Sequence, residues 1–250
     1  MNRSLLILLL LVAPLANALP PERNYYITPD SLGLSYVQKT LVTLDKVELL
    51  SWMMTTKSTK PLRTTLIIAY PASGGNMANN LYYADAFLKA GFDVVLFDYR
   101  GFGHSSNFTI DPDYLYYNEH ITDVETAIMA VKKQFPNNRL GILSFSASTI
   151  LATLAVQNQP VDFLIGEGYV RDPQRIVDFW RKEDPTRQLM LPERSNAYVE
   201  ATHRVKCPML IMTGTKDDIT PPADVWAVAA MRPNRKVLLY DGYHLEGTSK

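Results

Sequence analysis

The stretch LGILSFSAST, residues 140–149, joins an apolar strand to a helix through serines at alternate positions, Ser144, Ser146 and Ser148. A strand that turns directly into a helix holds the residue between them in a strained conformation and exposes its side chain. The residues two positions before and after it must be small, because the two backbone segments pass close together there. We therefore expect Ser146 to present an exposed hydroxyl, with Ser144 and Ser148 as small spacers.

A plainer interpretation is that these serines only end the strand and cap the following helix, with Ser148 as the N-cap. A serine hydroxyl becomes nucleophilic near neutral pH when a base lies beside it, and histidine is the usual base. If Ser146 is a nucleophile, a histidine and an acid must therefore lie at the same edge of the fold.

Short strands alternate with helices along most of the chain. VQKTLVTL (37–44) and VELLSWMMTT (47–56) are expected to form an antiparallel hairpin, because β-branched and aromatic residues flank a tight polar turn. TTLIIAY (64–70) and FDVVLFDY (92–99) are apolar at nearly every position, as in parallel strands covered on both faces. Further strands are expected at 139–145, 161–168, 208–214 and 236–242, with helices at 81–89, 123–135, 148–156 and 223–231.

This alternation predicts the fold class α/β, with a mainly parallel sheet, an antiparallel N-terminal hairpin, right-handed crossovers and helices on both faces. Residues 170–206 interrupt it with Pro173, Pro185 and Pro192, yet they include several large apolar side chains. We therefore expect a short helical lid insertion there, over the edge of the sheet. A chain of 250 residues with 47% hydrophobic content fits one domain of this kind.

The first residues, MNRSLLILLLLVAPLANAL, carry one cation at Arg3, an apolar run over residues 5–16 and small residues on both sides of Asn17. This is the pattern of a secretory signal, and we expect cleavage after Ala18, which leaves residues 19–250 as the domain. The run is shorter than the roughly 18 to 20 apolar residues of a membrane-spanning helix. No membrane span is then expected after signal removal, and an uncleaved anchor is the second alternative.

The cysteine content and the charge balance indicate where in the cell the protein acts and which partners are not expected. Cys207 is the only cysteine, so an exported protein of this sequence has no internal disulfide, which favours a bacterial periplasm over a eukaryotic secretory route. Basic and acidic residues number 25 each and no basic run occurs, so nucleic acid is not an expected partner. The composition gives no indication of an oligomeric state.

The chain offers 4 histidines as candidates for the base. His244, in YDGYHLEG, follows the last expected strand and so lies at the same sheet edge as Ser146, because reactive groups of α/β sheets lie beyond the carboxyl ends of the strands. His104, His120 and His203 fit solvated loop positions. We therefore expect His244 to be the base.

An acid should orient this imidazole and stabilise its cation. The segment TGTKDD follows the strand at 208–214 and places Asp217 and Asp218 at the correct end. Asp217 is preferred, because Asp218 is closer to the next helix, where an acid acts as a cap or dipole partner. The resulting chain order, Ser146, Asp217 and His244, is the order of nucleophile, acid and histidine expected on such a sheet.

Acyl transfer at a serine also needs N–H donors for the negative oxygen that develops on the substrate. One is expected from the backbone of Ala147 at the N-terminus of the following helix, where the helix dipole helps. The second is expected from the backbone of Ser73 in YPASGGN (70–76), where Gly74 and Gly75 allow close approach. An ordinary glycine turn is the alternative for this segment.

Taken together, these motifs resemble the α/β-hydrolases, close to the small serine hydrolases with a minimal lid that include acyl-protein thioesterases and related esterases. The resemblance runs from about Leu32 to His244 and includes FDYRGFGHSS (97–106), in which Asp98 and Arg100 are implied to fix the loops under the site. Both elbow glycines of the family are serines here, and its oxyanion loop carries His-Gly where this chain has Pro-Ala at 71–72. The chain ends at residue 250, where the family continues into a helix, so either the fold tolerates its absence or the sequence is incomplete.

The resemblance implies a serine hydrolase that cleaves a small-molecule carboxylic ester or thioester through an acyl-Ser146 intermediate, with no metal and no cofactor. Phe179 and Trp180 in the insertion are candidates for contact with an acyl chain, although apolar lid residues more often pack against the sheet. The alternatives are a non-catalytic binding protein on the same scaffold or, among enzymes, a peptidase or haloperoxidase, because a fold does not fix a reaction.

Overall fold

The computed structural model of the protein describes residues 21–70, 74–193 and 195–247. The expected signal segment at residues 1–18 and the expected oxyanion donor Ser73 lie outside the described residues.

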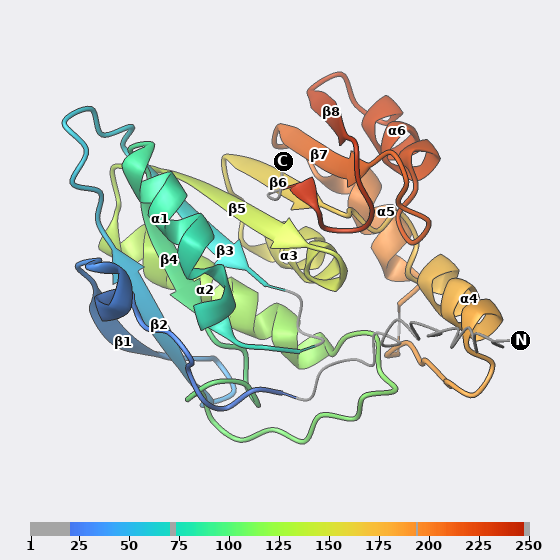
Figure 1. The fold of residues 1–250 in the computed structure, drawn as a ribbon, viewed down its shortest axis with the longest axis horizontal. Helices are drawn as coiled ribbons and strands as arrows, with labels where there is room; N and C mark the ends of the chain where they lie inside the picture. The colour runs from blue at the N-terminus through green and yellow to red at the C-terminus, as the bar shows by residue number, and fades with distance from the viewer. Residues whose placement is uncertain (1–20, 71–73, 194, 248–250) are drawn as a thin grey trace, which may run out of the picture.

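Within the described residues, an 8-stranded sheet forms the centre of the molecule (Figure 1). Its strands are β1 (Val37–Val42), β2 (Glu48–Met54), β3 (Thr64–Ala69), β4 (Asp93–Phe97), β5 (Arg139–Phe145), β6 (Phe163–Glu167), β7 (Met209–Gly214) and β8 (Arg235–Tyr240). They lie in the order β1-β2-β4-β3-β5-β6-β7-β8. The β1–β2 and β2–β4 pairs are antiparallel and the others are parallel. The predicted mainly parallel sheet with an antiparallel N-terminal hairpin is therefore confirmed.

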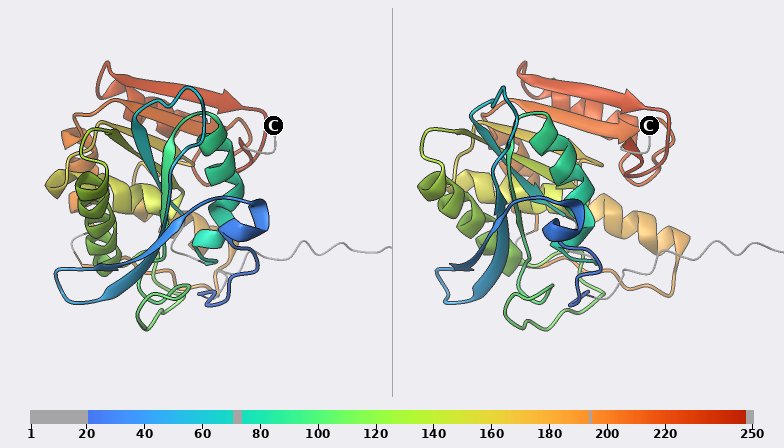
Figure 2. Two further views of the ribbon diagram at one scale, coloured as in Figure 1. Left: turned by 90° about the vertical axis from the view of Figure 1, so that its left-hand side faces the viewer. Right: turned by 60° about the vertical axis from the view of Figure 1, so that its left-hand side comes forward.

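Helices cover both faces of this sheet (Figure 2). The α-helices are α1 (Leu81–Lys89), α2 (Asn118–Gln134), α3 (Ala147–Asn158), α4 (Pro173–Glu183), α5 (Ala197–Arg204) and α6 (Pro222–Ala230), and short 3-10 helices occur at η1 (Pro29–Leu32) and η2 (Met77–Asn80). Helix α1 lies on one face, and α2 and α3 pack together on the other (Figure 2). All residues of β3 and β4 are buried, as the nearly continuous apolar runs predict for strands covered on both faces.

The segment expected to form a helical insertion, 170–206, contains α4 and α5. Helix α4 buries Pro173, Ile176 and Val177, so its apolar side faces the body of the protein. Helix α5 packs against α3. In Figure 1, α4 lies at one end of the molecule, on the side of the later strands.

The expected loop positions of two histidines, His120 and His203, are wrong. His120 is not in a solvated loop but in the first turn of α2, which begins at Asn118 rather than at residue 123. Its side chain is fully buried, Nε2 lies 3.3 Å from the carbonyl oxygen of Arg100, and burial lowers its pKa to about 3. Four aromatic rings surround it, those of Tyr99, Phe102, Phe108 and Tyr117. The polar sequence around His120 gives no sign that these rings close over the helix start.

The other two histidines expected in loops, His104 and His203, are exposed. His104 lies in the turn after β4, as expected, whereas His203 lies in the last turn of α5 rather than in a loop. The His104 N–H donates to the Tyr25 hydroxyl, and the His203 carbonyl oxygen accepts from the Arg232 guanidinium; within the described residues no hydrogen bond joins either histidine to Ser146.

Candidate active site

Ser146 lies at the sharp turn between β5 and α3. Its backbone angles are φ 48° and ψ −123°, a conformation that residues with a side chain rarely adopt. The turn is fixed by neighbouring groups, because the Ser146 N–H donates to the carbonyl oxygen of Glu167 at 2.9 Å. The Ser146 carbonyl oxygen accepts from the N–H and the hydroxyl of Thr149, at 2.9 Å and 2.7 Å. The predicted strained elbow is thus present at this residue.

The two neighbouring serines are buried, and their hydroxyls are used within the turn. Ser148 Oγ accepts from the Phe145 N–H at 2.7 Å and lies 2.6 Å from the carbonyl oxygen of Ala69. Ser144 Oγ donates to the carbonyl oxygen of Ile165 at 3.3 Å. Both residues occupy the spacer positions expected for them, which leaves Ser146 as the partly exposed hydroxyl of the three.

The structure brings Ser146, His244 and Asp217 together beyond the carboxyl ends of β5, β7 and β8. His244 Nε2 lies 3.0 Å from Ser146 Oγ, and His244 Nδ1 lies 2.8 Å from Asp217 Oδ2. Asp218, the alternative acid, has an exposed side chain. The geometry allows a proton to move from the serine hydroxyl to the imidazole while the carboxylate holds the ring.

Asp217 is buried, and its two oxygens accept several hydrogen bonds. Oδ1 accepts from the N–H groups of Ile219 and Thr220 at 2.9 Å and 2.8 Å, and Oδ2 accepts from the hydroxyls of Thr213 and Thr220. Burial by itself raises the pKa of this carboxyl, but the hydrogen bond and charge of His244, together with Thr220, outweigh burial and lower the pKa to about 2. Asp217 is therefore ionised at neutral pH, and its carboxylate lies against Nδ1 of His244.

Gly168 has no side chain, and the His244 ring occupies the space that a side chain there would fill. The glycine has φ +62°, and a Cβ atom there would lie 2.7 Å from His244 Cε1 and 3.0 Å from Leu245 Cδ2. A side chain would therefore strain the backbone and push the imidazole away from Ser146. Sequence reasoning missed Gly168, and its place directly after the strand that ends at Glu167 is the signal that could have identified it.

The two expected oxyanion donors are Ala147 and Ser73. Ala147 is the first residue of α3, so its N–H is one of the amides that have no partner within the helix. It follows the candidate nucleophile directly, which is the position that the prediction requires. Ser73 lies outside the described residues, so its role stays a prediction.

Asp98 holds the two ends of the loop that contains Ser73. Its Oδ1 accepts from the N–H of Met77 at 2.8 Å and from the hydroxyl of Tyr70 at 3.3 Å, and its Oδ2 accepts from the hydroxyl of Tyr25. The carboxyl is fully buried, and burial raises its pKa. A Cβ at Gly103 would lie 1.8 Å from Asp98 Oδ2, so only glycine fits there.

The segment at residues 21–25 ties this loop to the turn after β4, and sequence reasoning missed it. The Glu22 N–H donates to the carbonyl oxygen of Gly75 at 3.2 Å, and the Glu22 carbonyl oxygen accepts from the N–H of Gly103 at 2.9 Å. Asn76 Nδ2 donates to the carbonyl oxygen of Asn24 at 2.7 Å. These contacts join residues far apart in the sequence, and the polar segment has no periodicity that could have indicated them.

Arg100 acts farther from the candidate triad. Its guanidinium forms ion pairs with Asp45 at 2.6 Å and Asp123 at 2.7 Å, and its N–H donates to Asp123 at 2.9 Å. It therefore joins the turn after β1 to helix α2, a supporting contact rather than a contact with the site.

Phe179 and Trp180, the candidates for acyl contact, lie on α4 and are half-buried. Their rings meet edge to face with centroids 5.4 Å apart, and the guanidinium of Arg187 lies 4.8 Å from the centre of the Trp180 ring. Trp180 also packs against the hydrophobic core.

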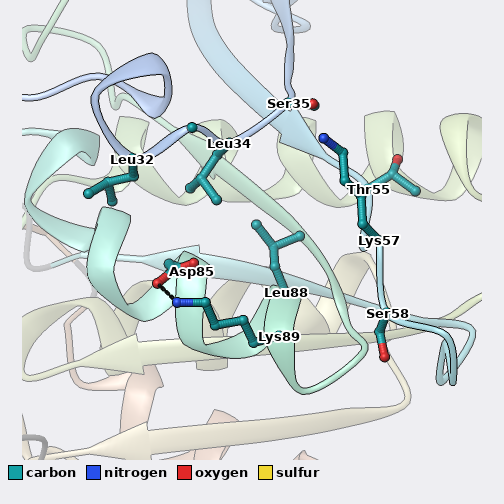
Figure 3. Close-up of a pocket in the computed structure, with 10 residues that line it drawn as sticks. Leu32, Leu34, Ser35, Thr55, Lys57, Ser58, Asp85, Leu88 and Lys89 are labelled. Atoms are coloured by element: carbon teal, nitrogen blue, oxygen red, sulfur yellow. Dashed lines mark hydrogen bonds and ion pairs between the residues drawn. The ribbon is translucent and has the colours of Figure 1, made fainter.

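A groove whose lining includes none of the three candidate catalytic residues is drawn in Figure 3. It has a volume of about 620 Å³ and is lined by Leu32, Leu34 and Leu88, with the ion pair between Lys89 and Asp85 at 2.6 Å. Thr55, which follows β2, also lines it, and the end of β2 pairs with the start of β4. The groove therefore lies near the end of the sheet at which the parallel strands begin, whereas Ser146 lies at the end at which they finish.

Two further properties of the described residues concern metal binding and membrane spans. These residues contain no group of three or more His, Cys, Asp or Glu side chains that could hold a metal ion. None of their helices is long and apolar enough to span a membrane.

Solved structures with a similar fold include proteins named as serine hydrolases and esterases. The fold is similar to that of an esterase from Pyrococcus furiosus, with a TM-score of 0.73 and 19% identity over 92% of each chain. A serine hydrolase without a lid from Xanthomonas campestris gives a TM-score of 0.60 and 19% identity, over 84% of this chain and 86% of that one. The strand order, the strand–turn–helix at Ser146 and these similarities show that the chain has the α/β-hydrolase fold.

Sequence comparisons give more particular similarities. The model of the family described as serine aminopeptidase, S33, matches residues 72–166. An uncharacterized membrane protein of Saccharomyces cerevisiae is 33% identical over 84 residues, which are 33% of this chain and 28% of that protein. The protein bem46 of Schizosaccharomyces pombe is 25% identical over 212 residues, which are 78% of this chain and 65% of that protein. The matched part of this chain thus spans less than two thirds of either relative.

Proposed function

We propose that this protein is a serine hydrolase that cleaves a carboxylic ester or thioester through an acyl intermediate on Ser146. The observation that carries the proposal is the hydrogen-bonded chain from Ser146 Oγ through His244 to Asp217, with distances of 3.0 Å and 2.8 Å. The esterase named among the similar structures supports this reaction class, although at 19% identity that likeness concerns the fold.

In the proposed reaction, His244 Nε2 takes the proton of Ser146 Oγ as the oxygen attacks the acyl carbon. The resulting oxyanion accepts hydrogen bonds from the two proposed donors, the N–H groups of Ala147 and Ser73. His244 then gives its proton to the departing alcohol or thiol. Water, deprotonated by His244, attacks the acyl group, and the proton returns to Ser146 as the carboxylic acid leaves.

Labelling with a serine-directed fluorophosphonate tests the nucleophile. We expect labelling of the intact protein and its complete loss in Ser146→Ala. Ser144→Ala is the matched control, because the Ser144 hydroxyl is turned to the backbone of β6 and its loss should leave labelling in place. Labelling that persists in folded Ser146→Ala would show that another residue is the nucleophile.

For the substrate, we propose an apolar acyl group that contacts Phe179 and Trp180 on α4. Hydrolysis rates should then rise from acetyl to longer acyl esters, and Phe179→Ala should reduce that preference. Equal rates from acetyl to long chains would contradict a role for α4 in shaping the pocket.

A peptidase is the second candidate, because the model of serine aminopeptidase, S33, matches residues 72–166. The same triad can attack an amide, provided that the leaving amine receives its proton from the histidine. Parallel assays with aminoacyl arylamides and with acyl esters of the same leaving-group size separate the two. Faster turnover of the arylamides would favour the peptidase.

We also propose that the chain is exported and cleaved after Ala18, with a retained N-terminal anchor as the alternative. The S. cerevisiae relative is named a membrane protein, which supports keeping the anchor in the test. N-terminal sequencing of protein from its own cells distinguishes the two: a mature chain that begins at Leu19 supports cleavage, and an intact leader in the membrane fraction supports the anchor.

A further inference from the structure

Glu167, the last residue of β6, contacts two parts of the candidate site. One is the sharp turn at Ser146, called the elbow here, and the other is the loop at residues 241–247 that carries His244, called the histidine loop. Its side chain is buried, with 1% of its surface exposed. The Glu167 carbonyl oxygen accepts the Ser146 N–H at 2.9 Å. Its carboxylate oxygen Oε1 accepts from the Tyr240 hydroxyl at 2.9 Å and from the Gly247 N–H at 2.8 Å. One residue therefore fixes the backbone of the candidate nucleophile and binds the loop that carries the candidate base.

The two groups that bind this carboxylate lie on either side of His244 in the chain. Tyr240 ends β8 just before the loop, and Gly247 follows His244 after it. The Tyr240 hydroxyl also accepts from the Glu246 N–H at 3.2 Å, so the two ends of the loop meet at one point. A Cβ at Gly247 would lie 2.8 Å from Glu167 Oε1, which shows how closely the backbone approaches the carboxylate.

The partners of this buried carboxylate are neutral. Among the described residues no ion pair joins Glu167 to a lysine, arginine or histidine. Burial and Glu167 raise the pKa of the Tyr240 hydroxyl, so Tyr240 stays a neutral donor. The buried carboxylate of Glu167 thus lies where the two ends of the histidine loop meet, and solvent screens it weakly there.

Other charged groups reach the same loop from the elements packed around it. Asp217 contacts His244 directly from the acid loop, and Glu246 accepts from the Tyr243 N–H within the histidine loop itself. Lys216 and Asp241 form an exposed ion pair at 2.8 Å, with side chains 54% and 74% exposed. Solvent screens that pair strongly, so its effect on His244 is smaller than that of a buried charge.

We propose that Glu167 is a positioning residue for His244: its carboxylate closes the base of the histidine loop and adds a second negative charge that favours the protonated imidazole. Asp217 orients the ring directly, whereas Glu167 fixes the loop relative to the elbow. The inference rests on the proposed function, because it assigns His244 the role of base.

Two variants separate the parts of this role. Glu167→Ala removes the acceptor for Tyr240 and Gly247, and we expect kcat to fall about 10- to 100-fold, with KM within about twofold, because a loop shift of about 1 Å is enough for such a loss. Glu167→Gln keeps an acceptor oxygen but removes the charge. The acid limb of its pH profile should move to lower pH, because the imidazolium loses a favourable neighbour.

Asp241→Asn is the matched control, because it removes one negative charge from the same loop at an exposed position. We expect its acid limb and kcat to stay at the wild-type values. An acid limb that moves equally in Asp241→Asn and Glu167→Gln, or that moves in neither, would overturn the electrostatic role. A fall in kcat matched by an equal rise in KM in Glu167→Ala would overturn the positioning role. If Glu167→Ala does not fold, Tyr240→Phe, which removes one of the two donors, replaces it with the same readouts.

NMR titration of the His244 imidazole distinguishes failure of this inference from failure of the proposed function. A lower imidazole pKa in Glu167→Gln than in wild type supports the role of Glu167 even if no ester is hydrolysed. An unchanged imidazole pKa in a protein that is labelled at Ser146 contradicts the role of Glu167 while the hydrolase proposal stands.

Discussion

Ser146 combines a partly exposed hydroxyl with a backbone conformation that side chains disfavour, since its φ is +48°. Such a conformation costs of the order of 1 to 3 kcal/mol and persists when surrounding contacts fix it. The bonds to Glu167 and Thr149 supply that constraint here. The strained backbone at Ser146 therefore lowers the free energy of unfolding, and this loss of stability accompanies the placement of the hydroxyl beside His244.

This cost can be measured by comparing two variants that both lack the hydroxyl. Ser146→Gly relieves the backbone, whereas Ser146→Ala keeps a Cβ at the same φ. We expect Ser146→Gly to unfold with a free energy about 1 kcal/mol higher than Ser146→Ala in urea titrations, and neither variant to be labelled by a fluorophosphonate. A glycine variant less stable than the alanine variant would show that the turn is not strained.

Gly168 allows a second test at the scale of one residue. Gly168→Ala places a methyl group 2.7 Å from His244 Cε1, so the ring must move away from Ser146. We expect kcat to fall about 100-fold. Gly33→Ala is the control, because Gly33 also has a positive φ, +65°, but a methyl group there would meet nothing within 4 Å. Both variants should lose similar stability, and only Gly168→Ala should lose activity; equal activity loss in both would assign the effect to backbone strain.

At the scale of elements, the apolar strands are the part that the sequence predicts best. Strands β3 and β4 are buried along their whole length, so hydrophobicity alone marks them. The start of α2 is not predictable in this way, because its first turn buries His120 rather than an apolar side chain. The segment at residues 21–25 is missed for a related reason, since its contacts are polar and reach across the chain.

Tyr25 tests whether that segment matters for stability. Tyr25→Phe removes one hydrogen-bond donor from the buried Asp98 carboxylate, and we expect the free energy of unfolding to fall by about 1 to 3 kcal/mol. Tyr26→Phe is the matched control, because the Tyr26 side chain is 84% exposed, and its loss should change stability by less than about 0.5 kcal/mol. Similar values for the two variants in urea titrations would contradict a supporting role for the segment.

At the scale of the whole molecule, the candidate triad lies where the order of strands predicts, because consecutive parallel strands deliver their following loops to one edge of the sheet. Ser146, Asp217 and His244 are visible in the sequence as loop residues after apolar strands. Glu167 is not, because its side chain reaches a loop that comes more than 70 residues later in the chain. Long-range polar contacts leave no local pattern.

His120 should contribute a loss of stability of the whole molecule in mild acid. Burial lowers the His120 pKa from 6.5 to about 3, so the unfolded chain binds a proton below pH 6.5 that the folded protein does not. The folded state therefore loses stability as pH falls below 6.5, by about 2 kcal/mol at pH 5 from this group. Asp217, whose pKa is lowered from 3.8 to about 2, stabilises the folded state above its unfolded pKa. This stabilisation is lost only as pH falls from about 4 to about 2.

Urea unfolding at pH 7 and pH 5 checks this expectation. Burial also raises the pKa of Asp123 to about 6, which favours the folded state as pH falls, but this effect is common to wild type and variant. Between pH 7 and pH 5, the free energy of unfolding of His120→Phe, which keeps an aromatic ring in the site, should therefore change by about 2 kcal/mol in the stabilising direction relative to wild type. His203→Phe is the control, because His203 is exposed and already solvated in the folded protein. A pH dependence unchanged in His120→Phe would contradict the assignment.

The contacts of residues 21–25 also determine the order in which parts of the chain can fold. A ribosome makes these residues early, but their partners at residues 74–76 and 98–105 emerge much later. Contacts that are distant in sequence form only after the intervening chain has closed into a loop. The contacts of residues 21–25 can therefore form only after the chain has been synthesised as far as Ser105.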